Sequence, residues 1–231
     1  MHHDVGGYPV QGGGTTAWRT LLRSDALHLV DQSGFVNLDQ LSLKSVLDLR
    51  VPEEVQIAPS PLGEFASRGV RHTHLSLVGD DFSELPPELG GVYSYIVGQR
   101  SSAVGAAIKS LAQPGALPGL VHCTAGKDRT GIVIAFTLTA IGVPDDFIAA
   151  DYALSSMYLE ADQTPVIGQV AASSGLGEQL TEALMASPPE LIVRALDQAR
   201  HAAGSIEGYL ARNGVTDADL SALRSALITS D

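Results

Sequence analysis

The sequence has a single cysteine and no long hydrophobic run. Cys123 is the only cysteine among 231 residues, so no internal disulfide can form, which is typical of a protein in a reducing compartment. No stretch of 18 apolar residues occurs, and we expect no membrane-spanning helix. The first residues lack the basic and apolar regions of a cleavable signal peptide. We therefore expect a cytoplasmic protein, or one secreted without a recognisable signal.

Basic residues are also scarce. The chain carries 14 Lys and Arg against 26 Asp and Glu, and its net charge is −12. Such a charge repels nucleic acids and anionic membranes, so we expect neither as a partner. Residues 141–231 carry 13 acidic and 4 basic side chains, a pattern that favours helices with a solvated acidic face over an acidic docking surface. Any phosphate site must therefore be built locally.

The chain is apolar enough, at 45%, to form one domain over residues 1–231. Residues 1–16 hold five glycines around Pro9 and predict a turn-rich lead-in without a helix. Short apolar runs predict strands at 18–22, 45–49, 70–78 and 120–123. Helical spacing is found at 92–111, 129–141, 145–160, 178–185, 190–203, 205–213 and 217–228. This order predicts an α/β fold, a central sheet flanked by helices, with a C-terminal all-helical extension.

The most informative stretch is His122-Cys123-Thr124-Ala125-Gly126-Lys127-Asp128-Arg129-Thr130-Gly131, between a predicted strand and a predicted helix. At such a junction the free amides and the positive dipole end of a helix can hold an anion, and small residues let the loop curl around it. A guanidinium binds two phosphate oxygens at once, so Arg129 suits a phosphate seated above Cys123. The predicted phosphate-binding residues are Thr124, Ala125, Gly126, Lys127 and Arg129.

Sulfur is the candidate nucleophile in this loop. Cations around a cysteine favour its reactive thiolate form, and here they are Arg129 and Lys127. His122 supports the loop by charge or by a hydrogen bond, and the Thr130 hydroxyl is suited to hydrogen-bond the departing sulfur. A nucleotide-binding loop of the Walker type is excluded, because Lys127 is followed by Asp128 instead of Ser or Thr.

The loop resembles the signature of the cysteine-dependent phosphatases, which is His-Cys, five residues, Arg, then Ser or Thr. Its ending, Gly-Lys-Asp-Arg-Thr-Gly, is similar to that of the bacterial atypical protein tyrosine phosphatases. Outlying segments are similar too: Asp4-Val5-Gly6-Gly7, Leu22-Arg23-Ser24, Asp48-Leu49-Arg50 with Glu54, and Asp151-Tyr152-Ala153-Leu154-Ser155. One departure is His3, where the family usually has Arg.

The resemblance implies the cysteine-phosphatase fold, with a mostly parallel sheet, and a phosphocysteine intermediate without metal or cofactor. It implies a phosphotyrosine substrate, with phosphoserine, phosphothreonine or phosphoinositides as further ones. The family can also shield its site with a helical cover, and the glycine-containing residues 155–185 are a candidate lid. A static helical layer is the alternative.

A leaving group needs a proton donor, and the interval between Asp81 and Cys123 contains no Asp. We take Asp128 as the candidate acid, and the resemblance implies the same. A loop-bracing role for Asp128, with Asp80 or Asp81 as the acid, is the alternative. Lys127 is either a contact for a second substrate phosphate or a solvated charge.

Two other functional classes remain open. One is a phosphate-binding module without turnover, which keeps Arg129 and the amide cradle. The other is a metal-dependent hydrolase built on His72 and His74, which lie two apart on a predicted strand. Tyr93, Tyr95 and Tyr152 are candidates to flank an aromatic phospho-substrate, but their helical spacing favours core packing.

Overall fold

The computed structural model describes residues 2–155 and 188–229. Its main sheet has the strand order β1-β3-β6-β4-β5. The strands are β1 (His2–Asp4), β3 (Leu21–Ser24), β4 (Ser45–Asp48), β5 (Arg71–His74) and β6 (Gly119–His122). All pairs are parallel except β1 with β3 at one edge. The expected mostly parallel central sheet is therefore confirmed.

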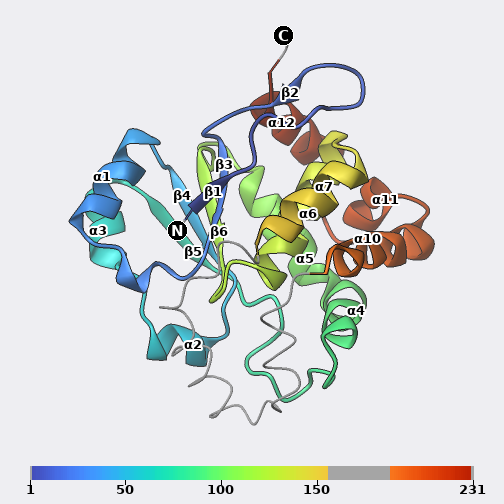
Figure 1. Ribbon diagram of the computed structural model, residues 1–231, viewed down its shortest axis with the longest axis horizontal. Helices are drawn as coiled ribbons and strands as arrows, with labels where there is room; N and C mark the ends of the chain where they lie inside the picture. The colour runs from blue at the N-terminus through green and yellow to red at the C-terminus, as the bar shows by residue number, and fades with distance from the viewer. Residues whose placement is uncertain (1, 156–187, 230–231) are drawn as a thin grey trace.

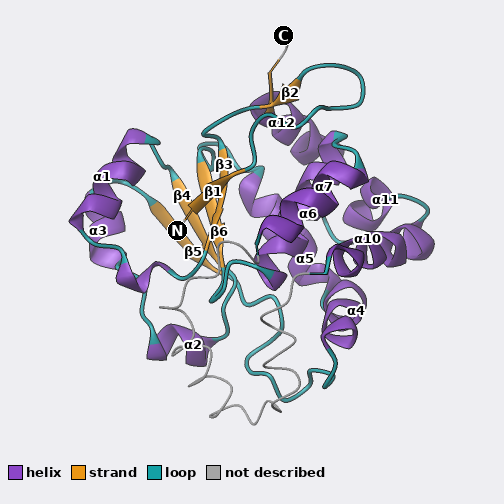
Figure 2. Cartoon of the chain, viewed as in Figure 1, coloured by secondary structure: helices purple, strands orange, loops and turns teal. Residues whose placement is uncertain are grey.

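Helices cover both faces of this sheet (Figures 1 and 2). On one side lie η1 (Leu27–Leu29), α1 (Gln32–Gln40) and α3 (Leu62–Ser67), and α2 (Pro52–Ile57) follows β4. On the other side lie α4 (Leu89–Gln99), α5 (Ser101–Leu111), α6 (Asp128–Ile141), α7 (Asp145–Leu154), α10 (Pro189–Ala203), α11 (Ile206–Arg212) and α12 (Asp217–Leu227). None of the described helices has the length and apolar character of a membrane span.

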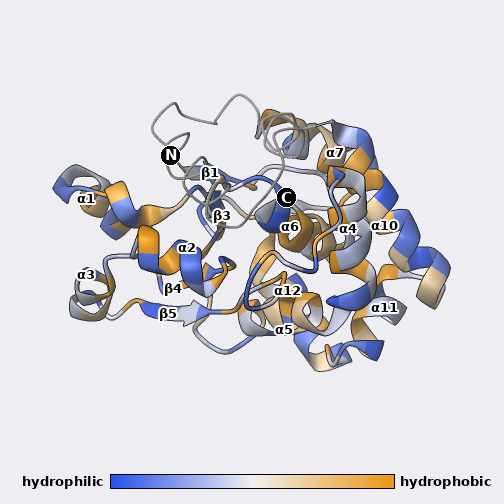
Figure 3. Cartoon of the chain, turned by 90° about the horizontal axis from the view of Figure 1, so that it is seen from below, coloured by the Kyte–Doolittle hydropathy of each residue, from blue (hydrophilic) through white to orange (hydrophobic). Residues whose placement is uncertain are grey.

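The core is divided by the sheet into two hydrophobic clusters, and the larger one surrounds α6. Almost every residue of α6 is buried, because the sheet covers one side and other helices cover the rest (Figure 3). Strands β3, β4 and β6 are buried at every position, as parallel strands with both faces covered should be. Helix α6 ends at Gly142 in the left-handed conformation, with φ of 99°.

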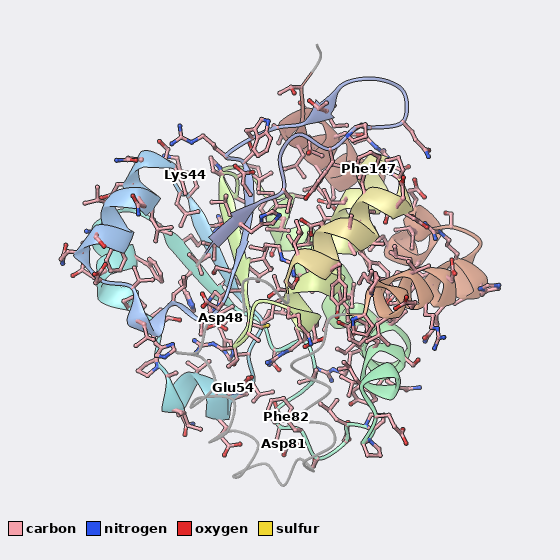
Figure 4. All side chains as sticks on the ribbon, viewed as in Figure 1. Lys44, Asp48, Glu54, Asp81, Phe82 and Phe147 are labelled. Atoms are coloured by element: carbon pink, nitrogen blue, oxygen red, sulfur yellow. The ribbon has the colours of Figure 1, made fainter. Side chains whose placement is uncertain are left out.

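Strand register brings three chain segments together at the carboxyl ends of the parallel strands. His122, the last residue of β6, is paired with Ser24 of β3 on one side and with Asp48 of β4 on the other. Figure 4 shows Lys44, just before β4, at the opposite end of the sheet from Asp48. The carboxyl ends of the parallel strands therefore meet where the loop after Cys123 begins.

Several elements differ from the sequence prediction. The expected helix 92–111 is two helices, because the chain turns at Arg100, which has φ of −106° and ψ of 20°. The strand expected at 18–22 starts later, at Leu21, and Trp18 is exposed. The chain end described here is not helical: β7 (Ile228–Thr229) pairs with β2 (Thr15–Thr16). The helix expected at 178–185, and all of the candidate lid except Ser155, lie outside the described residues.

Candidate active site

The loop of residues 123–127 leaves the carboxyl end of β6 and leads directly into α6. Cys123 is 2% exposed, and α6 begins at Asp128. The first amides of a helix have no partner within the helix, and its dipole is positive at this end. The structure thus places a buried cysteine beside a helix N-terminus. This position is at the carboxyl ends of the parallel strands, where ligands of such sheets bind.

Gly126 gives the loop its shape. Its φ is +67°, a left-handed conformation that glycine adopts at little cost. A Cβ atom at this position would lie 2.4 Å from the carbonyl oxygen of Ser24 at the end of β3. The amide of Ala26 also donates a hydrogen bond of 3.0 Å to the carbonyl oxygen of Thr124. The loop is therefore packed backbone to backbone against the segment after β3.

Arg129 is held at the loop by Glu54, a residue of α2. Its Nη1 and Nη2 donate to the two carboxylate oxygens of Glu54, at 2.5 and 2.8 Å. Glu54 also accepts from the Thr124 hydroxyl and, at 2.8 Å, from the amide of Val51. Burial disfavours the charge on Glu54, but Arg129 and the hydrogen bonds from Thr124 and Val51 together outweigh this effect and hold the pKa of Glu54 below its usual value. The guanidinium is thus oriented before any ligand binds.

Phe82 also contacts this guanidinium. The Arg129 Cζ lies 5.7 Å from the centre of the Phe82 ring, within the range of a cation–π contact. Phe82 is 8% exposed and precedes α4. Figure 4 shows Glu54, Phe82 and Asp81 at the same end of the molecule.

A second arginine, Arg23 of β3, holds the loop by hydrogen bonds to its backbone. Its Nη2 donates to the carbonyl oxygens of Gly126 and Lys127, at 2.9 and 3.3 Å. It also donates to the Ser155 hydroxyl at 2.7 Å, and its Nη1 pairs with Asp151 of α7 at 2.7 Å. Asp151 in turn contacts His3 Nε2 at 2.8 Å. One buried ion pair therefore ties the loop to β3, to α7 and to the N-terminal strand.

Asp48, the last residue of β4, lies between an arginine and two histidines. Arg50 is fully buried and donates to both carboxylate oxygens, at 2.9 and 2.7 Å. The Nε2 atoms of His122 and His72 lie 3.6 and 3.7 Å from Asp48 Oδ2. The three potential ligand atoms lie within 4.8 Å of one another. A divalent cation here would meet the buried charge of Arg50, so we interpret the cluster as a support for the loop.

His122 links this cluster to the nucleophile. Its Nδ1 lies 3.1 Å from the carbonyl oxygen of Cys123. Burial lowers the pKa of His122 to about 4, although the carboxylate of Asp48 opposes this effect. The imidazole is therefore neutral at neutral pH, and it supports the loop by a hydrogen bond instead of by charge.

Asp128 is buried and is contacted on one oxygen by two tyrosines. Its Oδ1 accepts hydrogen bonds from the hydroxyls of Tyr93 and Tyr152, at 2.8 and 3.3 Å. The ammonium of Lys127 lies 3.6 Å from the same oxygen. The alternative acids Asp80 and Asp81 are exposed, and Asp81 bonds the amide and hydroxyl of Ser83.

Lys127 is fully buried, contrary to the alternative of a solvated charge. Burial lowers its pKa, and Asp128 and Cys123 oppose this effect through their charges. Thr130 is buried, and its hydroxyl has no hydrogen-bond partner among the described residues, Cys123 included. The structure therefore does not show the contact to sulfur that we expected of Thr130.

Some residues of the site were not recognised from the sequence. Glu54 was noted in the sequence as part of the family resemblance, and in the structure it holds Arg129. Arg23 and Asp151 belong to the segments that gave the family resemblance, which was the available signal for them. His74, a candidate metal ligand, has its Nε2 2.7 Å from the carbonyl oxygen of Arg50.

The chain is similar in sequence to known tyrosine phosphatases. A model of the tyrosine phosphatase family matches residues 3–229. A tyrosine-protein phosphatase of Nostoc commune is 33% identical over 150 residues, which are 61% of this chain and 49% of the relative. The triple specificity protein phosphatase PtpB of Mycobacterium tuberculosis is 30% identical over 123 residues, 48% of this chain and 44% of the relative. The matches thus span about half the length of these two relatives.

Among solved structures, the core catalytic domain of the PP-IP phosphatase SIW14 from S. cerevisiae is similar, with a TM-score of 0.44 and 22% identity. The match covers 75% of this chain and 94% of that domain.

The close packing of Gly126 predicts that Gly126→Ala disrupts anion binding. The added Cβ meets the Ser24 carbonyl, so the loop must shift and its affinity for tungstate, measured by calorimetry, should fall at least about tenfold. Gly115→Ala is a matched control, because φ is +69° and no atom lies within 4 Å of the added Cβ. The control should lose only about 1–2 kcal/mol of stability from backbone strain. Equal tungstate affinity in both variants would contradict this packing.

The burial of His122 predicts that the protein is less stable in mild acid. The unfolded chain binds this proton with a pKa near 6.5 and the folded protein with a pKa of about 4. The contribution of neutral His122 is therefore present above pH 6.5 and is lost as the pH falls toward 4. Between pH 7 and 4.5 the loss should be on the order of 2–3 kcal/mol in urea unfolding. His122→Asn should show a clearly flatter dependence, and an unchanged slope would refute the assignment.

Proposed function

The chain belongs to the tyrosine phosphatase family, and we propose on this basis that it hydrolyses phosphate monoesters with Cys123 as the nucleophile. The observation that carries the proposal is the orientation of Arg129 by Glu54 beside the loop after Cys123. Glu54 engages two of the five N–H donors of the guanidinium. The remaining donors are available for the oxygens of a phosphoryl group seated over the sulfur.

In the first step the thiolate of Cys123 attacks phosphorus. An S–P bond forms, the P–O bond to the leaving group breaks, and that oxygen takes a proton from Asp128. The loop amides, the α6 dipole and Arg129 stabilise the charge on the three phosphoryl oxygens, and they are in place before the reaction. Lys127 and Arg129 both interact electrostatically with Cys123, as cations do around cysteine nucleophiles.

In the second step water attacks the phosphocysteine. Ionised Asp128 takes a proton from the water, an O–P bond forms, and the S–P bond breaks to return the thiolate and inorganic phosphate. The same carboxyl group thus acts first as acid and then as base. No metal ion takes part in either step.

We propose phosphotyrosine as the preferred substrate, with phosphoserine, phosphothreonine and phosphoinositides as further ones. The names of the relatives support this range, since one is a tyrosine-protein phosphatase and another has triple specificity. Lys127 favours the phosphotyrosine end of the range. It is fully buried, so its charge is not presented at the surface to a second phosphate.

Two alternatives give different results in the same assay. A phosphate-binding module would bind vanadate without steady turnover. A metal-dependent hydrolase would lose activity with a chelator and would keep it after Cys123→Ser. The lid over residues 155–185 stays a proposal, and hydrogen exchange of this segment with and without vanadate tests it.

The nucleophile assignment predicts that Cys123→Ser abolishes turnover and keeps anion binding. A serine hydroxyl at this position is a far weaker nucleophile, so steady hydrolysis of 4-nitrophenyl phosphate should fall by at least about three orders of magnitude. Vanadate binding should change little, since Arg129 and the loop amides are intact. Arg129→Lys should lose both properties, because an ammonium cannot bind two oxygens in a planar fork. Steady turnover by purified Cys123→Ser would overturn the assignment.

The proton-donor assignment predicts that the loss of rate in Asp128→Asn depends on the leaving group. Phenolate leaves poorly without a proton, so phenyl phosphate hydrolysis should slow by about a hundredfold or more. A nitrophenolate leaves readily, and 4-nitrophenyl phosphate should slow far less. Asp80→Asn and Asp81→Asn are the controls, because both side chains are exposed. If either control shows the leaving-group dependence and Asp128→Asn does not, the acid is wrongly assigned.

A further inference from the structure

Two buried tyrosines meet at the carboxyl group of Asp128. Tyr93 comes from α4 and Tyr152 from α7, and their hydroxyl oxygens are 2.6 Å apart. Both hydroxyls are directed at Oδ1 of Asp128, at 2.8 Å from Tyr93 and 3.3 Å from Tyr152. The two rings pack edge to face, with an interplanar angle of 87°. Core packing explains the rings, but it does not explain why both hydroxyls converge on one carboxylate oxygen.

The two hydroxyls act as permanent donors. Tyr93 is 2% exposed and Tyr152 is 1% exposed. Burial, followed by the negative charge of Asp128, raises the pKa of both tyrosines. Both phenols therefore stay protonated at neutral pH.

The distances also order the donors. Three hydrogen bonds are possible: between the two hydroxyls, and from each hydroxyl to Asp128. The two hydroxyls carry only one proton each, so the three cannot all form at full strength. The two shortest links form a chain in which Tyr152 donates to Tyr93 and Tyr93 donates to Oδ1 of Asp128. The ammonium of Lys127 approaches the same oxygen, at 3.6 Å. With Oδ1 occupied as an acceptor, a proton bound to Asp128 resides on Oδ2.

The close approach of α7 to α6 makes this chain possible. Gly131 lies three residues after Asp128 on α6, and a Cβ atom there would be 2.8 Å from the ring of Tyr152. A larger residue at this position would push Tyr152 away from the carboxyl group. The glycine thus sets the distance at which the second hydroxyl reaches the network.

We propose that Tyr93 and Tyr152 are positioning residues for Asp128. They hold the carboxyl group by Oδ1 and keep Oδ2 as the oxygen that gives a proton to the leaving group and later takes one from water. This inference rests on the proposed function, because it assigns a task to the acid of that reaction. A carboxyl group fixed in this way loses little orientational freedom when the reaction occurs.

A double-mutant cycle with Tyr93→Phe and Asp128→Asn tests the proposal. Phenylalanine keeps the ring and removes only the hydroxyl. In the wild-type background Tyr93→Phe should lower kcat for phenyl phosphate by about tenfold, with KM within about twofold, and it should affect 4-nitrophenyl phosphate less. In the Asp128→Asn background it should have no further effect, because the group that it positions is already absent. Tyr152→Phe should act in the same direction and more weakly.

Tyr209→Phe is the matched control for a lost buried hydroxyl. Tyr209 of α11 is 4% exposed, and its hydroxyl donates to the carbonyl oxygen of Val97 in α4, at 2.7 Å. It should lower the melting temperature and leave the leaving-group dependence unchanged. If Tyr93→Phe lowers kcat equally in both backgrounds, or equally for both substrates, its role is structural and the proposal is wrong. Should Tyr93→Phe fail to fold, the same cycle with Tyr152→Phe decides.

The outcome is separable from that of the proposed function. If the wild-type protein does not hydrolyse either aryl phosphate, the proposed function fails, and the positioning inference fails with it because it assigns a task in that reaction. If the wild type turns over and Asp128→Asn shows its leaving-group dependence, but Tyr93→Phe is indistinguishable from wild type, only the positioning inference is overturned.

Discussion

Charge buried at one end of the sheet is the constraint on which the site depends. An ionised group removed from water is strongly destabilising unless it is paired and hydrogen-bonded. Here two buried arginines and one partly buried arginine lie near one loop, and each has a buried carboxylate partner: Arg23 with Asp151, Arg50 with Asp48, and Arg129 with Glu54. Two of the pairs join segments that are far apart in the chain, and the Arg50 pair lies within the segment that ends β4. The pairs therefore fix the loop by the same contacts that make the burial of charge tolerable.

The three pairs have different tasks at the loop. The Arg23 pair holds two loop carbonyls and fixes the backbone. The Arg50 pair lies behind the nucleophile, next to neutral His122. The Arg129 pair leaves donors of a fixed guanidinium for an anion. In the proposed mechanism, this arrangement is the preorganised electrostatic environment that stabilises a phosphoryl transition state.

Much of the fold, and the loop itself, could be predicted from the sequence. The strand before Cys123 and the helix after it follow from hydrophobic periodicity, and the spacing to Arg129 indicates a phosphate site. The break at Arg100 could not be seen, because the apolar spacing continues on both sides of it. The pairing of Glu54 with Arg129 joins residues 75 positions apart, and no local pattern encodes that contact. The same holds for Tyr93. Its helical spacing indicates core packing and does not show which residue its hydroxyl contacts.

In the proposed mechanism the phosphoryl group passes through Cys123, and it can be trapped there. The wild-type protein is mixed with a phosphorus-labelled aryl phosphate, quenched in acid within the first turnovers, and digested for peptide mass spectrometry. The account predicts a phosphorylated peptide that contains Cys123, formed as the first equivalent of phenol is released and lost as inorganic phosphate appears. Turnover without any label on Cys123, or label on a different residue, would contradict it.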